Sequence, residues 1–556
     1  MPLFGLALVA AFPAAAETWA PGETIEKAAY ADLTPEGLNA VAALIPALLP
    51  SGIEIPDMND EGGYWCFNYA YGLAGAWVNI SVTNATITPG NGVLDITANL
   101  MVSLNDPSDT FQLMYELACL DDTCEGYVDA FPVTVATTMA LEVVDDGTGV
   151  NMLDATIGAI NVSYDLVNED IHLDGCSVGD IEEVLNWFGL SMYDLILGQV
   201  DTFLQDAIAD IGPTLEETIE EAFASATIVQ ELDLNGAVVQ LSLQPSDVVI
   251  TPAGVRVQMS GSMAGSAAPC VAAYDPGGSI KTPSSAPNLG VVPSSISGDF
   301  HVGLILSDDF TNQALYALWR GGLLCYTLEP GGAFPLDTSI LNVLTGSVFA
   351  ELFPESQPMV LQTAPMSPPT TSFDGSHDID VNLENLGLEL YTQLDGRDTK
   401  IVTVSLEGIV GMDLGFDGTT GELALDVDLD PAALTPTVTY NEFYPEANEA
   451  IVAGFSGAFG GIVDSVVGGL LEGLAFALPS FSGIGLLDLE AGPVGDNADW
   501  LGAFAWVGPT PYEASSGCGE DGGCSSEGCS GGCSSSPGGV GLWPALGLLL
   551  VLRRRQ

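Results

Sequence analysis

One short pattern in this 556-residue chain has the form of a catalytic motif, Gly175-Cys176-Ser177-Val178-Gly179. It matches the G-x-S-x-G turn that presents a nucleophilic serine, and such a serine needs a histidine as its base. The candidates are His172, His301 and His377. The surrounding sequence lacks the parallel-strand pattern that supports this turn, and among 65 glycines so short a match arises easily by chance. We therefore predict no catalytic residues and no enzymatic activity.

Three aspartate-rich stretches raise the question of a metal site: Asp145-Asp146, Asp308-Asp309 and the run from Asp426 to Asp430. None has the spacing or the glycine of a calcium-binding EF-hand loop. Turn chemistry accounts for the first stretch and strand alternation for the third. Paired CxxC motifs or an HxxxH pair, which would provide zinc ligands, are absent from the sequence. We predict no metal and no cofactor.

The ten cysteines divide into six in the body of the chain and four in its C-terminal tail. In an exported protein the six body cysteines are expected to form disulfides. The sequence does not choose among their pairings, although Cys119 and Cys124 bracket a short turn and are candidates for closing a local loop. The body cysteines are Cys66, Cys119, Cys124, Cys176, Cys270 and Cys325.

The charge balance of the chain is strongly acidic, with a formal net charge of −65. Three of its nine basic residues are the terminal arginines, so the body sets six scattered basic residues against all 74 acidic ones. Because a phosphate backbone must be met by clustered lysine and arginine, nucleic acid is excluded as a partner. Hydrophobic residues make up 47% of the chain, which predicts an apolar interior inside an acidic, salt-tolerant surface.

The N-terminal residues 1–16 have the form of a secretory signal peptide. An apolar run from Leu3 to Phe12 is too short to span a bilayer, and it ends in the small residues Ala14-Ala15-Ala16. We therefore expect export, with cleavage before Glu17.

The C-terminal tail, which begins with a Gly/Ser/Cys-rich spacer at 511–539, has four parts in order: a Gly-Cys pair, a small-residue stretch, a short apolar helix and terminal arginines. The apolar stretch is shorter than a stable membrane span. With Gly532-Cys533 as the Gly-Cys pair, this tail resembles the MYXO-CTERM sorting signal of myxobacteria. The resemblance implies processing and anchoring at Gly532 and Cys533 by a sorting protease. An ordinary single-span anchor is the alternative.

The first half of the body alternates between helical and strand patterns. Thr34 followed by Pro35 predicts a helix start. Alternation from Trp65 to about Leu173 predicts an antiparallel meander, with one strand expected at Ile157–Val162. Strands at Ala237–Leu243 and Val248–Ser260 are expected to pair. Between them and the meander, a long helix is predicted from Ile181 to about Ala224, and its apolar stripe is Ile196, Val200, Phe203 and Ala207.

A Pro/Ser/Gly-rich linker at 266–298 separates the two halves, and the order of elements then repeats. Strand His301–Leu306 leads through Ser307 into a helix that stops at Gly321-Gly322. Strands are expected over 323–440, a second long helix over Pro445–Leu478, and closing strands at Ile484–Glu490 and Trp500–Val507. The apolar stripe of the second helix is Val452, Phe455, Phe459 and Val463.

The second long helix is apolar enough to be taken for a membrane span, since Ala450–Leu478 contains only Asp464 and Glu472 as charges. A span here would place the closing strands across the membrane from the sheet that they complete. We therefore predict a helix packed within the protein.

The stretch Ile296–Leu324, ISGDFHVGLILSDDFTNQALYALWRGGLL, resembles the start of the second domain of the bactericidal/permeability-increasing protein family. The segment Leu478–Val507 resembles that family's terminal strands. The family includes lipopolysaccharide-binding and lipid-transfer proteins and belongs to the tubular lipid-binding (TULIP) folds. The resemblance implies an α+β fold of two tandem TULIP-like domains in a boomerang, each with a long helix on a highly twisted antiparallel sheet and an apolar pocket for acyl chains. Together with the signal, linker and tail described above, it gives these predicted boundaries: signal peptide 1–16, N-terminal domain 24–265, linker 266–298, C-terminal domain 299–510, spacer 511–539, sorting helix and basic tail 540–556.

The family also has a disulfide between sheet and long helix in its first domain, which makes Cys176 a candidate partner here. Members that grip lipopolysaccharide do so with a lysine- and arginine-rich tip, and nothing comparable occurs in this sequence. Recognition of anionic lipid A is therefore not expected.

These patterns lead to one functional prediction: a lipid-binding carrier, exported and anchored at the surface of a Gram-negative bacterium through its processed C-terminus. Its ligand would be a phospholipid or a fatty acyl chain, bound by the two helical stripes. The alternative is an adhesive or structural surface protein whose cores are filled and which binds no ligand.

Overall fold

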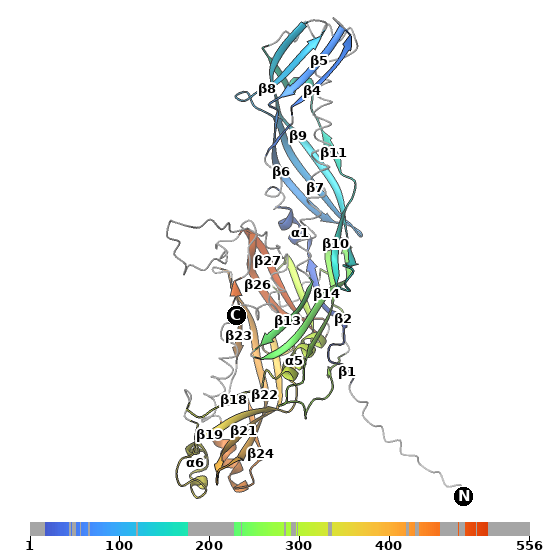
Figure 1. Cartoon of the computed structure of the whole chain (residues 1–556). Helices are drawn as coiled ribbons and strands as arrows, with labels where there is room; N and C mark the ends of the chain where they lie inside the picture. Colours follow the sequence, from blue (N-terminus) through green and yellow to red (C-terminus); the bar gives the residue numbers. More distant parts are fainter. Residues whose placement is uncertain are drawn as a thin grey trace, which may run out of the picture.

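The computed structural model describes residues 17–43, 46, 52–55, 57–64, 67–117, 120–175, 227–234, 236–282, 285–290, 296, 298–331, 336–418, 422–428, 433–455, 476–477, 484–495 and 497–509. These residues are mostly β-structure with few helices, which is compatible with the predicted α+β class. Figure 1 shows three sheets placed one after another along an elongated molecule, and we call them the N-terminal, central and C-terminal sheets.

The N-terminal sheet has ten antiparallel strands organised around one long strand, β9, which spans 26 residues. β8 pairs with the first part of β9 and β7 with the part that follows. β12, β11 and β10 also pair with β9, in that order along its length. The strands are β3 (Gly52–Glu54), β4 (Met58–Tyr64), β5 (Phe67–Ala74), β6 (Trp77–Pro89), β7 (Leu94–Leu104), β8 (Phe111–Leu117), β9 (Leu120–Asp145), β10 (Asn151–Ile157), β11 (Asn161–Tyr164) and β12 (Ile171–Asp174).

The meander was predicted correctly as antiparallel strands, but the expected strand Ile157–Val162 is wrong. β10 ends at Ile157 and β11 begins only at Asn161. Between them Gly158 passes so close to β9 that a Cβ there would lie 2.4 Å from Thr138 Oγ1. The alternating pattern therefore continues through a break between two strands, where glycine leaves room for the Thr138 side chain.

The central sheet joins strands from both halves of the chain, in the order β13-β14-β15-β2-β17-β27-β26. The predicted closing strands of the two halves therefore lie in one sheet. The strands expected at Ala237–Leu243 and Val248–Ser260 do pair, but the second range is wrong at its start: the chain turns between Thr251 and Gly254, so residues 248–251 belong to the first strand. The strands are β13 (Ile228–Leu234), β14 (Ala237–Thr251), β15 (Gly254–Gly265), β2 (Ile25–Leu33), β17 (Val302–Ser307), β27 (Trp500–Pro509) and β26 (Ile484–Val494).

The C-terminal sheet has eight strands built on the long hairpin of β21 and β22. Leu388, Leu390, Val402 and Val404 lie in its core. The strands are β18 (Thr327–Leu328), β19 (Met359–Pro365), β20 (Thr370–Ser372), β21 (Ile379–Leu394), β22 (Arg397–Asp417), β23 (Glu422–Asp428), β24 (Thr435–Tyr440) and β25 (Phe476–Ala477).

Two predictions for this half are wrong. The range 323–440 is not only strands, because the helix α6 (Ser339–Thr345) and a 3-10 turn, η2 (Val348–Ala350), interrupt it. The Asp337 carboxylate accepts the Ser339 amide at 2.8 Å where α6 begins, and Gly346 ends it at φ 66°. The second long helix does not reach Leu478, because β25 pairs with β23 and so satisfies main-chain groups at the sheet edge.

Two helices begin where their capping residues predict, and the second also ends at its predicted glycine. The Thr34 side chain accepts the Gly37 amide at the start of α1 (Pro35–Ala42). The Ser307 side chain accepts the Phe310 amide at the start of α5 (Asp308–Gly321), and Gly322 ends α5 at φ 91°. Shorter helical pieces are η1 (Asn168–Asp170), η3 (Pro445–Ala447) and residues 448–455. The long helix predicted from Ile181 lies outside the described residues.

The predicted linker is attached to the protein body along its first part, residues 266–282, which we call the strap. Within it, β16 (Ser279–Ile280) pairs with β1 (Thr18–Trp19) near the N-terminus. The domain boundaries on either side of the linker remain predictions.

Candidate functional site

One face of the N-terminal sheet is apolar across β6, β7, β9 and β11, and we call it the inner face. Every even-numbered residue of β7 from Leu94 to Leu104 is buried. In register with Leu100 lie Val82 on β6 and Val133 on β9, and Tyr164 on β11 lies opposite Val133. Strand alternation thus gathers aliphatic and aromatic side chains from four strands on one side.

The opposite face of the same strands is polar. It carries Asp95, Thr97, Asn99 and Ser103 of β7, and the Asn99 side chain accepts the Thr134 hydroxyl at 3.0 Å. The inner face includes side chains that keep part of their surface accessible, and these are the described residues best suited to contact a further apolar molecule. They include Ile80, Val82, Val135, Val162 and Tyr164.

Of the eight residues predicted to bind lipid, the structure describes Val452 and Phe455, in the helical residues 448–455. Phe455 is 3% exposed and packs with Leu341, Leu344 and other residues of the C-terminal core, whereas Val452 is partly exposed. The remaining candidates, and the predicted processing residues Gly532 and Cys533, lie outside the described residues: Ile196, Val200, Phe203, Ala207, Phe459 and Val463.

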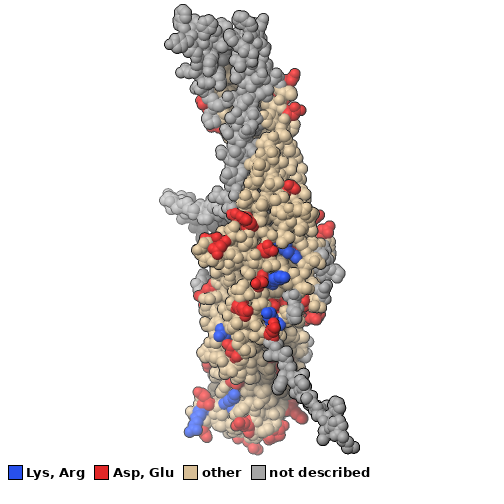
Figure 2. Space-filling model, turned by 90° about the vertical axis from the view of Figure 1, so that its right-hand side faces the viewer, with Lys and Arg blue, Asp and Glu red and all other residues tan. Residues whose placement is uncertain are grey.

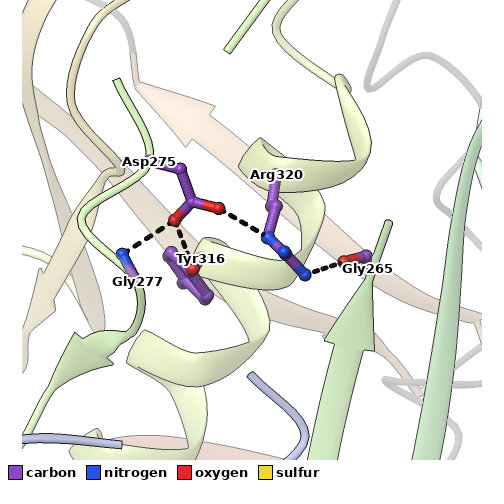
Figure 3. Close-up of polar contacts among 5 residues, drawn as sticks. All are labelled: Gly265, Asp275, Gly277, Tyr316 and Arg320. Atoms are coloured by element: carbon purple, nitrogen blue, oxygen red, sulfur yellow. Dashed lines mark hydrogen bonds and ion pairs between the residues drawn. The ribbon is translucent and has the colours of Figure 1, made fainter. Parts of the chain in front are cut away.

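A second, chemically different region surrounds α5, where buried polar side chains meet the strap (Figure 3). Asp275 of the strap accepts the Tyr316 hydroxyl at 2.6 Å and the Gly277 amide at 2.9 Å. Its other oxygen accepts Arg320 Nε at 2.8 Å, and Arg320 Nη1 donates to the Gly265 carbonyl at 2.6 Å. We call Asp275, Tyr316 and Arg320 the hub.

Electrostatics match this geometry. Burial on its own would raise the pKa of Asp275, but the hydrogen bonds from Tyr316 and Arg320 outweigh it and lower that pKa below its ordinary value. Burial, together with the hydrogen bond to Asp275, raises the pKa of Tyr316. The hub therefore holds an ionised carboxylate between a neutral phenol and a guanidinium at neutral pH.

Other polar side chains of α5 bind main-chain atoms from both halves of the chain. Gln313 accepts the Met263 amide at 2.8 Å and donates to the Glu23 carbonyl at 2.8 Å. Asn312 accepts the Thr371 amide at 2.8 Å, and Trp319 Nε1 donates to the Pro365 carbonyl at 3.0 Å. The helix is thus fixed by partners from before the strap and from the C-terminal sheet.

A buried ion pair lies in the central sheet. Arg256 Nε and Nη2 donate to the two carboxylate oxygens of Asp32 at 2.6 and 2.5 Å, and Nη1 donates to the Pro287 carbonyl. The guanidinium also lies 4.7 Å from the centre of the Tyr30 ring. Such a bidentate pair is costly to desolvate and depends on all of its partners.

The acidic surface carries few basic side chains, and most of those that the structure describes form ion pairs. Figure 2 shows the acidic residues scattered over the lower part of one face, with a few basic ones among them. Ion pairs with carboxylates engage Arg256, Lys281, Arg320 and Lys400.

Two cysteines of the strap region are joined, since Cys270 and Cys325 form a disulfide. Cys124 is also disulfide-bonded, to a partner outside the described residues. Cys119 lies outside the described residues, so the local loop suggested between Cys119 and Cys124 stays a prediction.

Each of the three histidines forms a hydrogen bond with another residue of the protein. His172 bonds Asp129 at 2.8 Å, His301 bonds main-chain atoms of Val507, and His377 bonds Asp380 at 2.9 Å. Ser177 lies outside the described residues. In the part of the chain that the structure describes, no group of three His, Cys, Asp or Glu residues could hold a metal ion, and no helix is long and apolar enough to cross a bilayer.

Comparison with protein-family models finds no match, and comparison with curated protein sequences finds none either. Among solved structures, a lipopolysaccharide binding protein matches with a TM-score of 0.49 and 14% identity, over 88% of this chain and 100% of that one. P47 of Clostridium botulinum E1 matches with a TM-score of 0.24 and 8% identity, over 87% of this chain and 99% of that one. At these TM-scores neither likeness carries a fold or a ligand over to this chain.

Sequence reasoning missed the hub and the buried ion pair. Asp275 and Arg320 stand 45 residues apart, and no local pattern joins them. One signal was available: in a body with six basic residues and 74 acidic ones, an arginine inside an otherwise apolar segment is expected to have a fixed carboxylate partner.

Proposed function

We propose that this protein is an exported lipid carrier that binds acyl chains through apolar surfaces and is anchored at a bacterial cell surface, with no enzymatic activity. Export rests on the signal-like residues 1–16, and anchoring rests on the tail with Gly532 and Cys533. A phospholipid or fatty acyl chain is the proposed ligand.

The observation that carries the proposal is the inner face of the N-terminal sheet. Its rows of aliphatic side chains run across β6, β7, β9 and β11, and several members remain partly exposed. Burying methylene groups yields about 0.8 kcal/mol each, so a sixteen-carbon chain offers roughly 12 kcal/mol before the cost of association. An apolar surface of this extent is sufficient for acyl-chain binding without a special motif.

The charges favour a neutral or zwitterionic lipid over an anionic one. The net charge of −65 repels anionic headgroups, and four of the six basic residues of the body already pair with carboxylates. A ligand with little net charge avoids that repulsion.

The proposal is tested by native mass spectrometry of the exported protein, purified from an oxidising host and followed by extraction and identification of lipids. One or two equivalents of co-purified lipid are expected. Val82→Trp should lower the lipid content because Val82 is a partly buried residue of the inner face. Ser81→Trp is the matched control, since Ser81 is exposed on the opposite face of the same strand.

A specific observation favours one rival function, an adhesive or structural surface protein with filled cores. Phe455, a predicted lipid contact, is 3% exposed within a packed cluster that includes Leu341 and Phe349. A lipid-free protein that also refuses added fluorescent fatty acid and phospholipid would favour this rival over the carrier.

A further inference from the structure

We propose that the strap is a disulfide-locked latch that keeps α5 in place and thereby helps to fix the central and C-terminal sheets relative to each other. This inference concerns the conformation of the chain and does not rest on lipid binding.

The first step is the position of α5 between the two halves. Gln313 bonds main-chain atoms of Met263 and Glu23, which precede the strap. Asn312 and Trp319 bond main-chain atoms of the C-terminal sheet region, at Thr371 and Pro365. A shift of α5 would break contacts to the central and C-terminal sheets together, so whatever retains α5 adds to their relative placement, beside the direct apolar packing of Leu501 against Ile379 and Leu414.

The second step is the course of the strap along α5, from its last turn to its first. At the C-terminal end of α5, the Ala268 amide donates to the Arg320 carbonyl at 2.8 Å. Near the middle, Val271 is fully buried against Tyr316 and Trp319. The strap therefore covers the helix as well as touching its ends.

The remaining attachments are made by a few groups. Asp275 binds Tyr316 and Arg320, as in the hub. At the N-terminal end of α5, the Thr282 amide donates to Asp309 at 2.7 Å and its hydroxyl donates to Asp308 at 2.6 Å. Apart from the two-residue strand β16, the strap pairs with no sheet of the described residues, so it is held by these side-chain bonds, by buried Val271 and the Ala268 amide, and by one covalent bond.

That covalent bond is the disulfide between Cys270 in the strap and Cys325 just beyond α5. Disulfides form and persist in oxidising compartments and are rare where thiols are kept reduced. The latch therefore locks only in an oxidising compartment, and a reduced chain has the strap free to leave α5 while each sheet keeps its own core.

Hydrogen exchange of the full exported protein tests the latch. The double variant Cys270→Ser/Cys325→Ser and the single variant Asp275→Ala should each speed exchange at the Ala268 and Thr282 amides by about tenfold or more, with β7 and β22 unchanged. Tyr274→Ser is the matched control, because Tyr274 is the exposed neighbour of Asp275 in the strap, and it should leave these rates unchanged.

Small-angle X-ray scattering of the same variants tests the consequence for the whole molecule. The distribution of interatomic distances should broaden in the double variant and in wild-type protein treated with a reductant, and not in Tyr274→Ser. The latch is rejected if the distribution stays as narrow as in the oxidised wild type. It is also rejected if exchange in β2 and β15 accelerates as much as in the strap, because the strap would then be part of the common core.

Discussion

The inner face of the N-terminal sheet and the region around α5 are both buried, but different kinds of contact hold them. The inner face relies on apolar side chains in register, such as Val82, Leu100 and Val133. The region around α5 combines apolar packing with a set of single hydrogen bonds between distant residues, such as that from Tyr316 to Asp275. Apolar contacts have little directional preference, whereas hydrogen bonds require one geometry. The inner face can therefore accept apolar molecules of varied shape, whereas the hydrogen bonds of α5 are formed in only one arrangement of the helix and its neighbours.

The largest expected effect comes from placing a charge on the inner face. Val102 is 1% exposed, and Val102→Asp should destabilise the N-terminal sheet by at least about 3 kcal/mol because it buries a carboxyl without a partner. Hydrogen exchange at β7 measures the change. Ser103→Asp, on the polar face of the same strand, should stay within about 0.5 kcal/mol of wild type. Equal effects would mean that the two faces do not differ as described.

The next effect comes from breaking the buried pair in the central sheet. Arg256→Met should cost about 3–5 kcal/mol because it leaves the Asp32 carboxylate unpaired at 1% exposure of the residue. Chemical denaturation followed by the fluorescence of nearby Trp500 measures it. The double variant Asp32→Leu/Arg256→Met should recover most of the loss. If the double variant does not recover stability, the contacts of Arg256 with Pro287 and Tyr30 contribute stability that the apolar replacement does not provide.

A smaller effect is expected where α5 contacts the C-terminal sheet. Trp319→Phe keeps an aromatic ring but removes the Nε1 donor to the Pro365 carbonyl, at a cost of about 1–3 kcal/mol for the buried acceptor left behind. Hydrogen exchange in β19 should respond more than exchange in β14. The reverse order would contradict the assignment of Trp319 to the C-terminal half.

The smallest effect is a pH dependence at the start of α5. Burial raises the pKa of Asp308 above its ordinary value. A carboxyl whose pKa is raised by folding stabilises the protein when protonated, so its contribution is present at low pH and is lost as pH rises through the folded pKa. Asp308→Asn should therefore be more stable than wild type at neutral pH, with the difference shrinking on acidification. Thermal unfolding across that range measures it, and a constant difference would contradict it.

Local signals in the sequence were sufficient for the capped helices and for the alternating strands. Thr34 and Ser307 predict helix starts because a side-chain oxygen there accepts an amide of the first turn. Gly322 predicts a helix end because glycine adopts positive φ without strain. These are interactions among neighbours in sequence, so they can be predicted without knowing the fold.

Elements that depend on distant partners were not predictable in this way. The apolar pattern predicts a helix at β25, but these residues form a strand because they pair with the edge of β23. Gly158 interrupts a regular alternation because β9 passes close by. The hub depends on Asp275 meeting residues of α5 that only the folded chain brings together. Of the predicted lipid contacts, Phe455 illustrates the same limit, since an apolar helical stripe is equally consistent with a packed core.

The central sheet has a consequence for the order in which the protein can fold. β2, near the start of the chain, pairs with β17, and β17 in turn pairs with β27, near residue 505. Its ladder therefore closes only after nearly the whole chain is available, and such non-local pairing folds slowly. Until β27 arrives, β17 presents an open strand edge, which is a site for pairing with other chains. A chain truncated before Ile484 would keep that edge exposed permanently and should aggregate.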